Sequence, residues 1–269
     1  MSSVSGLEIL KAGEQAKIAH ESCAIRKSRQ GPRLLVSIRS AAEAERAMAG
    51  GVEILDVKEP SLGSLGMARI DEIVAISRSG NISDGSTPLS VALGEVVDWP
   101  AASSFPKLPG GITFAKLGLS QCARQPDWRS DWQRVRAEFN RRSCSRLNWV
   151  AVAYADTKEA ASPSIAHVLD AAIETRCAGL LIDTWTKAEI TLLDRIDATQ
   201  LTEIAIACHA SGMFFAIAGK LQLESLPVLA RVPIDVIAIR SAACRGTDRT
   251  AELDSGRVAE FRNEMRYYF

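Results

Sequence analysis

An acid and an amine stand two positions apart in the segment ILDVKEPSLGSLG, residues 54–66. Asp56 and Lys58 end an apolar run, and positions i and i+2 of a strand share one face. Apolar surroundings disfavour a protonated lysine, and a neutral lysine is a nucleophile for carbonyl carbon. The spacing therefore predicts amine chemistry at Lys58, with Asp56 moving protons. The alternative is an ordinary structural ion pair.

Ionisable residues also end most of the other apolar runs. They are Arg39, Glu95, Lys116, Asp156, Asp183 with Lys187 shortly after it, Lys220 and Arg240. Lys116 lies in FAKLGL, where a surface position is hard to explain. It could still be a rim lysine with a buried stem and a solvated amine, and Asp156 and Asp183 could be helix caps. The pattern predicts that these groups, Asp156 included, open onto one mouth of the fold.

Small residues accompany two of these cations, in AIAGKL (216–221) and AIRSAACRG (238–246). Backbone N–H groups of small residues can approach an anion closely. The sequence thus predicts a phosphate site, with these candidate ligands: Gly219, Lys220, Arg240, Ser241, Ala242 and Ala243. Alternatively, the small residues only allow the turns to close.

Eight short apolar runs alternate with helical patterns, and they must position these groups. The expected strands are 33–39, 52–58, 89–96, 112–119, 148–156, 179–185, 214–220 and 236–243. Nearly continuous apolar runs are typical of parallel strands covered on both faces. We therefore predict an α/β fold, a (βα)8 TIM barrel over residues 33–269, with its chemistry at the carboxyl ends of the strands. A doubly wound sheet is the alternative, but SIRSAAEA after the first strand has no glycine.

Helix signals separate the runs. Ser40 and Glu43 predict a capping box, and Ser162 before a proline predicts another helix start. A closing helix over 253–269 is expected to face inward with Val258, Phe261 and Met265. Residues 1–32 are expected to be an extension, either disordered or a helix that covers the bottom of the barrel.

The chain has 269 residues, with 32 basic and 32 acidic residues and a net charge of zero. Nucleic-acid and membrane-surface partners usually need a cationic excess, so neither is expected. No apolar run approaches a membrane span, and the start lacks a secretory signal.

The six cysteines form no CxxC motif, which favours reduced thiols and a cytoplasmic location. The three histidines lie far apart, so no metal site is expected. A homo-oligomer is left open.

Six segments together resemble the (5-formylfuran-3-yl)methyl phosphate synthases, also called 4-(hydroxymethyl)-2-furancarboxaldehyde-phosphate synthases. They are LLVSIRSAAEAERAMAGGVEILDVKEPSLGSLG, AKLGL, AYAD, LLIDTWTK, AIAGKLQLE and AIRSAACRGTDR. The resemblance implies a (βα)8 lyase of methanofuran biosynthesis that needs no cofactor. Such an enzyme joins two glyceraldehyde 3-phosphate molecules into a phosphorylated furan aldehyde, releasing one phosphate and water.

The same resemblance implies roles for individual residues. Lys58 matches the Schiff-base lysine of the family, and Lys116 matches its proton-transferring lysine. Other active-site positions fall on Asp56, Asp183 and Lys187. The chain departs from the family pattern at Lys220, Gln222 and Ser241, so the phosphate ligands stay open. Another phosphosugar aldolase, isomerase or epimerase on the same barrel is an alternative, as is a catalytically silent binding barrel.

Overall fold

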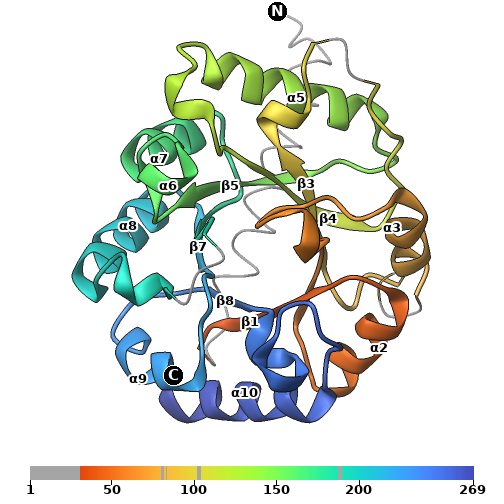
Figure 1. Ribbon diagram of the computed structural model, residues 1–269, viewed down its shortest axis with the longest axis vertical. Coiled ribbons are helices and arrows are strands. Elements are labelled where there is room, and N and C mark those ends of the chain that lie inside the picture. Colours follow the sequence, from red (N-terminus) through yellow and green to blue (C-terminus); the bar gives the residue numbers. More distant parts are fainter. Residues whose placement is uncertain (1–30, 80–81, 83, 102–103, 187–189) are drawn as a thin grey trace, which may run out of the picture.

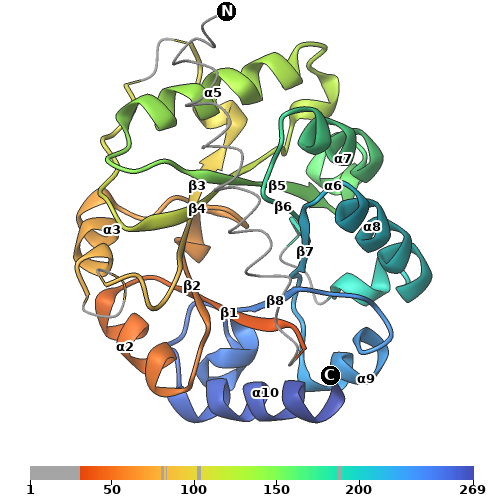
Figure 2. The ribbon, with the colours of Figure 1, turned by 180° about the vertical axis from the view of Figure 1, so that it is seen from behind.

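A computed structural model describes residues 31–79, 82, 84–101, 104–186 and 190–269. Parallel strands pair in sequence order and close into a barrel when β1 pairs with β8 (Figures 1 and 2). The strands are β1 Arg33–Ile38, β2 Ile54–Val57, β3 Leu89–Glu95, β4 Ile112–Gly118, β5 Asn148–Tyr154, β6 Gly179–Asp183, β7 Phe214–Ile217 and β8 Val236–Ile239. The predicted (βα)8 fold is confirmed, and each predicted strand contains the observed one.

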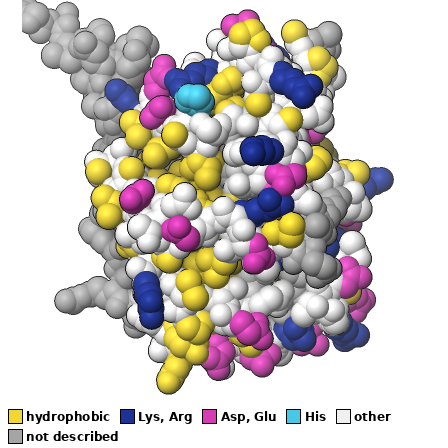
Figure 3. All heavy atoms as spheres, turned by 60° about the vertical axis from the view of Figure 1, so that its left-hand side comes forward, with side chains coloured by type: hydrophobic (Ala, Val, Ile, Leu, Met, Phe, Trp, Pro, Cys, Tyr) yellow, Lys and Arg dark blue, Asp and Glu magenta, His cyan; other side chains and the backbone are white. Residues whose placement is uncertain are grey.

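Helices surround this sheet on its outside (Figure 1). They are α2 Ala41–Ala49, α3 Ile70–Ser77, α5 Trp128–Arg142, α6 Thr157–Ala160, α7 Ile165–Glu174, α8 Ala198–Ala210, α9 Leu226–Leu229 and α10 Ser255–Tyr268. Acidic and basic side chains are interspersed on the face turned forward in Figure 3, as expected for a chain without net charge. No helix in the described part of the chain is long and apolar enough to cross a membrane.

Strand alternation separates two apolar layers. In β2, Leu55 and Val57 belong to the large cluster that packs under the helices, whereas Ile54 belongs to the cluster inside the barrel. Successive side chains of a strand point to opposite faces, so Asp56 and Lys58 follow Ile54 into the interior. The inner cluster also holds Phe114, whose ring centroid lies 5.5 Å from that of Phe214 in an edge-to-face arrangement. Apolar rings thus form the floor beneath the charged end of the barrel.

The helix ends show which local predictions hold. The Ser40 hydroxyl accepts a hydrogen bond from the Glu43 N–H at 3.3 Å, as expected of an N-cap. The Glu43 carboxylate does not complete the predicted capping box, because it binds Arg39 and Arg240 instead. The cap of α7 is Ser164, which accepts the His167 N–H, and not Ser162. In α10 the expected inward residues Val258, Phe261 and Met265 are buried, which confirms the closing helix.

Candidate active site

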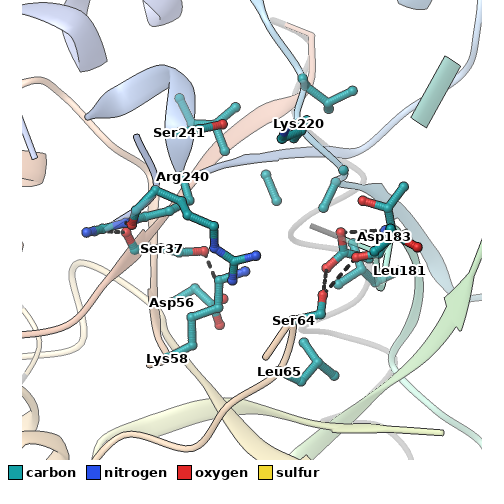
Figure 4. A pocket seen from close by; sticks show the side chains of 18 of the residues that line it. Ser37, Asp56, Lys58, Ser64, Leu65, Leu181, Asp183, Lys220, Arg240 and Ser241 are labelled. Carbon is teal, nitrogen blue, oxygen red and sulfur yellow. Dashed lines mark hydrogen bonds between the residues drawn. The ribbon is translucent and has the colours of Figure 1, made fainter. Parts of the chain in front are cut away.

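A pocket of about 260 Å³ opens at the carboxyl end of the barrel. Its lining comes from the strand ends and the loops after them, and includes Ser37, Asp56, Lys58, Ser64, Lys116, Asp183, Gly219, Lys220, Arg240, Ser241 and Arg249. In Figure 4, Asp56 and Lys58 lie on one side of the pocket and Asp183 and Ser64 on the other. The structure therefore brings Asp56, Lys58, Lys116 and Asp183 together, as their shared strand-end positions predict.

Asp56 and Lys116 form a buried ion pair. The Lys116 Nζ lies 2.7 Å from Asp56 Oδ1, and the two residues are 3% and 1% exposed. Ser37, which pairs with Asp56 in the strand register, donates its hydroxyl to Asp56 Oδ2 at 3.3 Å. Burial alone would raise the pKa of Asp56, but the positive charges of Lys116 and Lys58 outweigh it and lower that pKa. The carboxylate beside Lys58 is thus ionised and already paired.

Lys58 has different surroundings. It is 9% exposed and makes no ion pair within 4.0 Å with any residue that the structure describes. Burial lowers the pKa of its amine, the negative charges of Asp183 and Asp56 oppose that shift, and the positive charges of Lys116 and Arg249 reinforce it. Desolvation is the largest of these causes, ahead of repulsion between cations. The pocket environment thus favours the neutral form of the Lys58 amine.

Asp183 is oriented from two sides. Its Oδ2 accepts the Ser64 hydroxyl at 3.0 Å, and its Oδ1 accepts the Thr184 N–H at 2.8 Å. Ser64 belongs to the loop after β2, so this bond joins that loop to β6 across the mouth (Figure 4). Lys187, the further catalytic candidate, lies outside the described residues.

Two strand-end acids do not line the pocket. Asp156 accepts the N–H groups of Trp185 and Thr186 at 2.8 and 2.7 Å, so both of its oxygens hold the loop after β6. Glu95 accepts the Tyr154 hydroxyl at 2.6 Å and the Ser120 N–H at 2.8 Å. The structure thus places the Asp156 carboxylate under the loop after β6 and outside the pocket lining, and its role in binding substrate stays a prediction.

Only some of the residues predicted to bind phosphate line the pocket. Gly219, Lys220 and Ser241 line the pocket, whereas Ala242 and Ala243 do not, and the Ala243 N–H already bonds to the Arg240 carbonyl. Gly219 has φ +108°, and a Cβ there would lie 3.0 Å from Thr184. Only glycine accepts both the backbone angle and the close approach.

Arg240 lines the pocket but uses its donors within the protein. Its Nη1 and Nη2 bind the Glu43 carboxylate at 2.6 and 3.0 Å. The same two nitrogens also reach the carbonyls of Ser37 and Ala251, and Nε reaches the carbonyl of Arg249. A guanidinium has five N–H donors, and all five are engaged here. Arg240 therefore supports the loop after β8 through these bonds, and its role as a phosphate ligand stays a prediction.

Among the pocket residues that sequence reasoning missed are Ser37, Ser64 and Arg249. Ser37 was detectable, since it lies at the inward position of the first strand that corresponds to Asp56 in the second. Ser64 and Arg249 lie in loops, where no periodicity marks the direction of a side chain. In the described part of the chain, no group of three or more His, Cys, Asp or Glu residues is arranged to hold a metal ion.

Comparison with known proteins gives three kinds of match. A family model described as 4-HFC-P synthase matches residues 34–262. The (5-formylfuran-3-yl)methyl phosphate synthase of Methanosarcina acetivorans is 31% identical, over 85% of this chain and 98% of the relative. The enzyme of that name from Methanococcus maripaludis strain S2 is 30% identical, over 81% of this chain and 92% of the relative.

Solved structures show the same fold at low identity. The GGGPS of Thermoplasma volcanium has a TM-score of 0.61 at 12% identity and covers 92% of this chain and 95% of its own. The KGPDC of Streptococcus mutans has a TM-score of 0.52 at 10% identity, covering 89% of this chain and 100% of its own. These likenesses concern the barrel alone. The family model and the relatives extend over most of the chain, so the protein belongs to the (5-formylfuran-3-yl)methyl phosphate synthase family.

Proposed function

We propose that this enzyme condenses two glyceraldehyde 3-phosphate molecules into (5-formylfuran-3-yl)methyl phosphate, releasing phosphate and water through a Schiff base on Lys58. One observation carries the proposal: Lys58 is a buried amine with a lowered pKa and no ion pair among the described residues. Imine formation needs a neutral amine, which this environment favours. We place the reaction in the biosynthesis of a methanofuran-type cofactor, in the cytoplasm.

The two lysines have separate tasks. The Lys116 amine forms an ion pair with Asp56, and an ammonium ion has no free electron pair to attack a carbonyl. Lys58 therefore attacks the aldehyde carbon, and the resulting carbinolamine loses water to give an imine. Lys116 and Asp56 supply and remove the protons that these steps require.

The imine then serves as an electron sink. It acidifies the neighbouring C–H bond, and loss of that proton gives an enamine that attacks the second aldehyde. Asp183, held by Ser64 and Thr184, stabilises the positive charge of the protonated imine through space. Lys187 completes the catalytic set by its match to the family. Gly219, Lys220 and Ser241, which line the same pocket, receive a substrate phosphate.

The test combines product analysis with covalent trapping. Purified protein incubated with glyceraldehyde 3-phosphate should develop the near-ultraviolet absorbance of a conjugated furaldehyde. Borohydride added during turnover should attach a triose-phosphate adduct to the peptide that contains Lys58. Lys58→Arg should lose both signals, because a guanidinium stays charged and forms no imine. Lys158→Arg, an exposed lysine on α6, is the matched control and should keep both.

Three results would redirect the proposal. An adduct on Lys116 would exchange the roles of the two lysines. A Lys58 adduct without furan absorbance would indicate a simpler phosphosugar aldolase on the same barrel. Furan formation without any lysine adduct would indicate an enolate mechanism, in which Lys58 acts only through its charge.

A further inference from the structure

We propose that Arg249, in the loop after β8, is the guanidinium that binds a substrate phosphate in this pocket. The inference rests on the proposed function only in requiring a phosphorylated substrate. It concerns a residue that the sequence patterns did not single out, and it moves the arginine ligand from Arg240 to Arg249.

The donors of Arg249 are the first support. Its side chain is partly buried and lines the pocket together with Lys58 and Asp183. Nη2 donates to the Gly63 carbonyl at 2.9 Å. Nε is buried and has no hydrogen-bond partner among the described residues. A buried N–H without a partner is costly, and an arginine fork matches two phosphate oxygens at once. Nη1 likewise makes no hydrogen bond with a described residue, so an anion in the pocket would bind the open N–H groups of this guanidinium.

The charge of Arg249 is the second support. No carboxylate of the described residues lies within 4.0 Å of its guanidinium, whereas Arg240 binds both oxygens of Glu43. Burial lowers the pKa of Arg249, although the negative charges of Asp183 and Glu59 oppose that shift. Placing a cation in a partly buried site without a direct counter-ion costs free energy. A phosphate dianion would supply the missing negative charge.

The backbone around Arg249 is fixed by other arginines. Arg240 Nε donates to the Arg249 carbonyl at 2.9 Å, and Arg39 Nη1 donates to the Thr250 carbonyl at 2.7 Å. Thr250 also donates its N–H and hydroxyl to Asp248 at 2.8 and 2.7 Å. These bonds hold the chain on both sides of Arg249 before any ligand arrives. Arg39 and Arg240 thus contribute to anion binding by positioning Arg249, without contacting the anion themselves.

The test measures phosphate binding directly, without catalysis. Glycerol 3-phosphate carries the phosphate but no carbonyl, so its binding cannot depend on an imine. Titration calorimetry with the full-length chain should show binding of glycerol 3-phosphate to the wild type. In Arg249→Gln the affinity should fall about tenfold to a hundredfold, as expected for loss of charge-assisted hydrogen bonds. Arg249→Lys keeps the charge but loses the fork, so it should lie between the two.

The matched control is Arg245→Gln on the same loop. Arg245 is exposed and faces Glu252 and Asp254 at 3.8 Å, so this variant should bind like the wild type. Near-ultraviolet circular dichroism and thermal unfolding establish that each variant is folded. Unchanged affinity in Arg249→Gln, or no binding of glycerol 3-phosphate by the wild type, overturns the assignment.

Activity separates this inference from the proposed function. If the wild type makes no furan product while its phosphate binding still depends on Arg249, the proposed reaction fails and the assignment stands. If the wild type makes the product and Arg249→Gln retains the wild-type KM, the assignment fails and the reaction stands.

Discussion

Lys58 and Lys116 show how neighbouring side chains of one type come to differ. Both lie inside the barrel near Asp56, but only Lys116 forms the close ion pair, at 2.7 Å. That pair occupies one carboxylate oxygen, and Ser37 donates to the other. Lys58 is left with burial as the largest influence on its pKa. These few contacts leave Lys116 in an ion pair, whereas Lys58 has a lowered pKa and no ion pair with a described residue.

We predict that the amine of Lys58 reacts at lower pH than an exposed lysine does. A lowered pKa means that the neutral fraction rises earlier on the pH scale, below the value of about 10.4 for a free lysine. Reductive methylation with formaldehyde, mapped by peptide mass spectrometry across a pH series, gives the midpoint for each lysine. Lys158 is the exposed reference. Equal midpoints for Lys58 and Lys158 would contradict the expected shift.

The methylation midpoint of Lys58 should also change when Arg249 is replaced. The charged groups that act on Lys58 are Asp183, Asp56, Lys116 and Arg249, and the last of these lowers its pKa. Arg249→Gln removes a positive charge, so protonation of Lys58 becomes easier and the midpoint should move to higher pH. A midpoint that moved to lower pH would contradict the expected repulsion between Arg249 and Lys58.

At the scale of elements, Glu43 joins parts of the chain that are distant in sequence. From α2, its carboxylate binds Arg39 after β1 and Arg240 after β8. The two arginines in turn bind carbonyls of residues 249–251. Burial alone would raise the pKa of Glu43, but hydrogen bonds from Arg240 and Arg39 outweigh it and lower that pKa. The ionised Glu43 carboxylate on α2 therefore binds the arginines that follow β1 and β8, and through them it holds the loop at residues 249–251.

We predict that Arg240→Met lowers the free energy of unfolding by about 3 kcal/mol, near the lower end of the range for broken buried ion pairs. The lower end applies because Arg39 still binds Glu43. Urea denaturation at neutral pH measures the change. Arg231→Met, an exposed arginine before β8, is the control and should stay within about 0.5 kcal/mol of the wild type.

The difference between Arg240→Met and the wild type should depend on pH. The pKa of Glu43 is lower in the folded than in the unfolded chain, so the pair stabilises the fold above the unfolded value of about 4.3. This contribution is lost as the pH falls through the folded pKa. The two unfolding free energies should therefore converge in acid, and a difference that grew in acid would contradict this account.

The same region shows what sequence could and could not predict. The Ser40 cap and the inward residues of α10 follow from local patterns, and both are found. The Arg39–Glu43 pair is also local, at positions i and i+4, but Arg240 reaches the same carboxylate from the end of β8, and only the closed barrel sets that distance. Likewise, the pattern placed Asp56 beside Lys58 correctly but could not show that Lys116, two strands away, forms the closer pair.

Across the whole molecule, the barrel interior is divided along its axis. Charged groups fill the carboxyl end, and the apolar inner cluster, with Phe114 and Phe214, closes the space below. Lys116 lines both the main pocket and the small cavity beside Phe114. The apolar floor therefore keeps water from the underside of the Asp56–Lys116 pair. The eight strands and this division were predictable, because both follow from apolar runs that end in charges.

We predict that Phe114→Ala lowers the free energy of unfolding by about 3–5 kcal/mol. The closed sheet around Phe114 limits collapse into the space left, so the substitution creates a cavity at the floor of the barrel. Urea denaturation measures the loss. Leu62→Ala, a side chain that is 69% exposed, is the control and should change stability by less than about 0.5 kcal/mol. A Phe114→Ala variant as stable as the control would mean that the floor repacks.

The loop after β2 is bound by the loop after β8 and by the end of β6: the Gly63 carbonyl accepts from Arg249, and the Ser64 hydroxyl donates to Asp183. The loops after β2, β6 and β8 therefore depend on one another, and none of them can be exchanged alone without losing these contacts. Transplanting this loop alone into a related barrel would carry over Lys58 but leave its neighbours unmatched. A one-residue insertion before Gly63 would misplace both contacts at once. In this barrel, new specificities should arise by exchanging the three loops as a set.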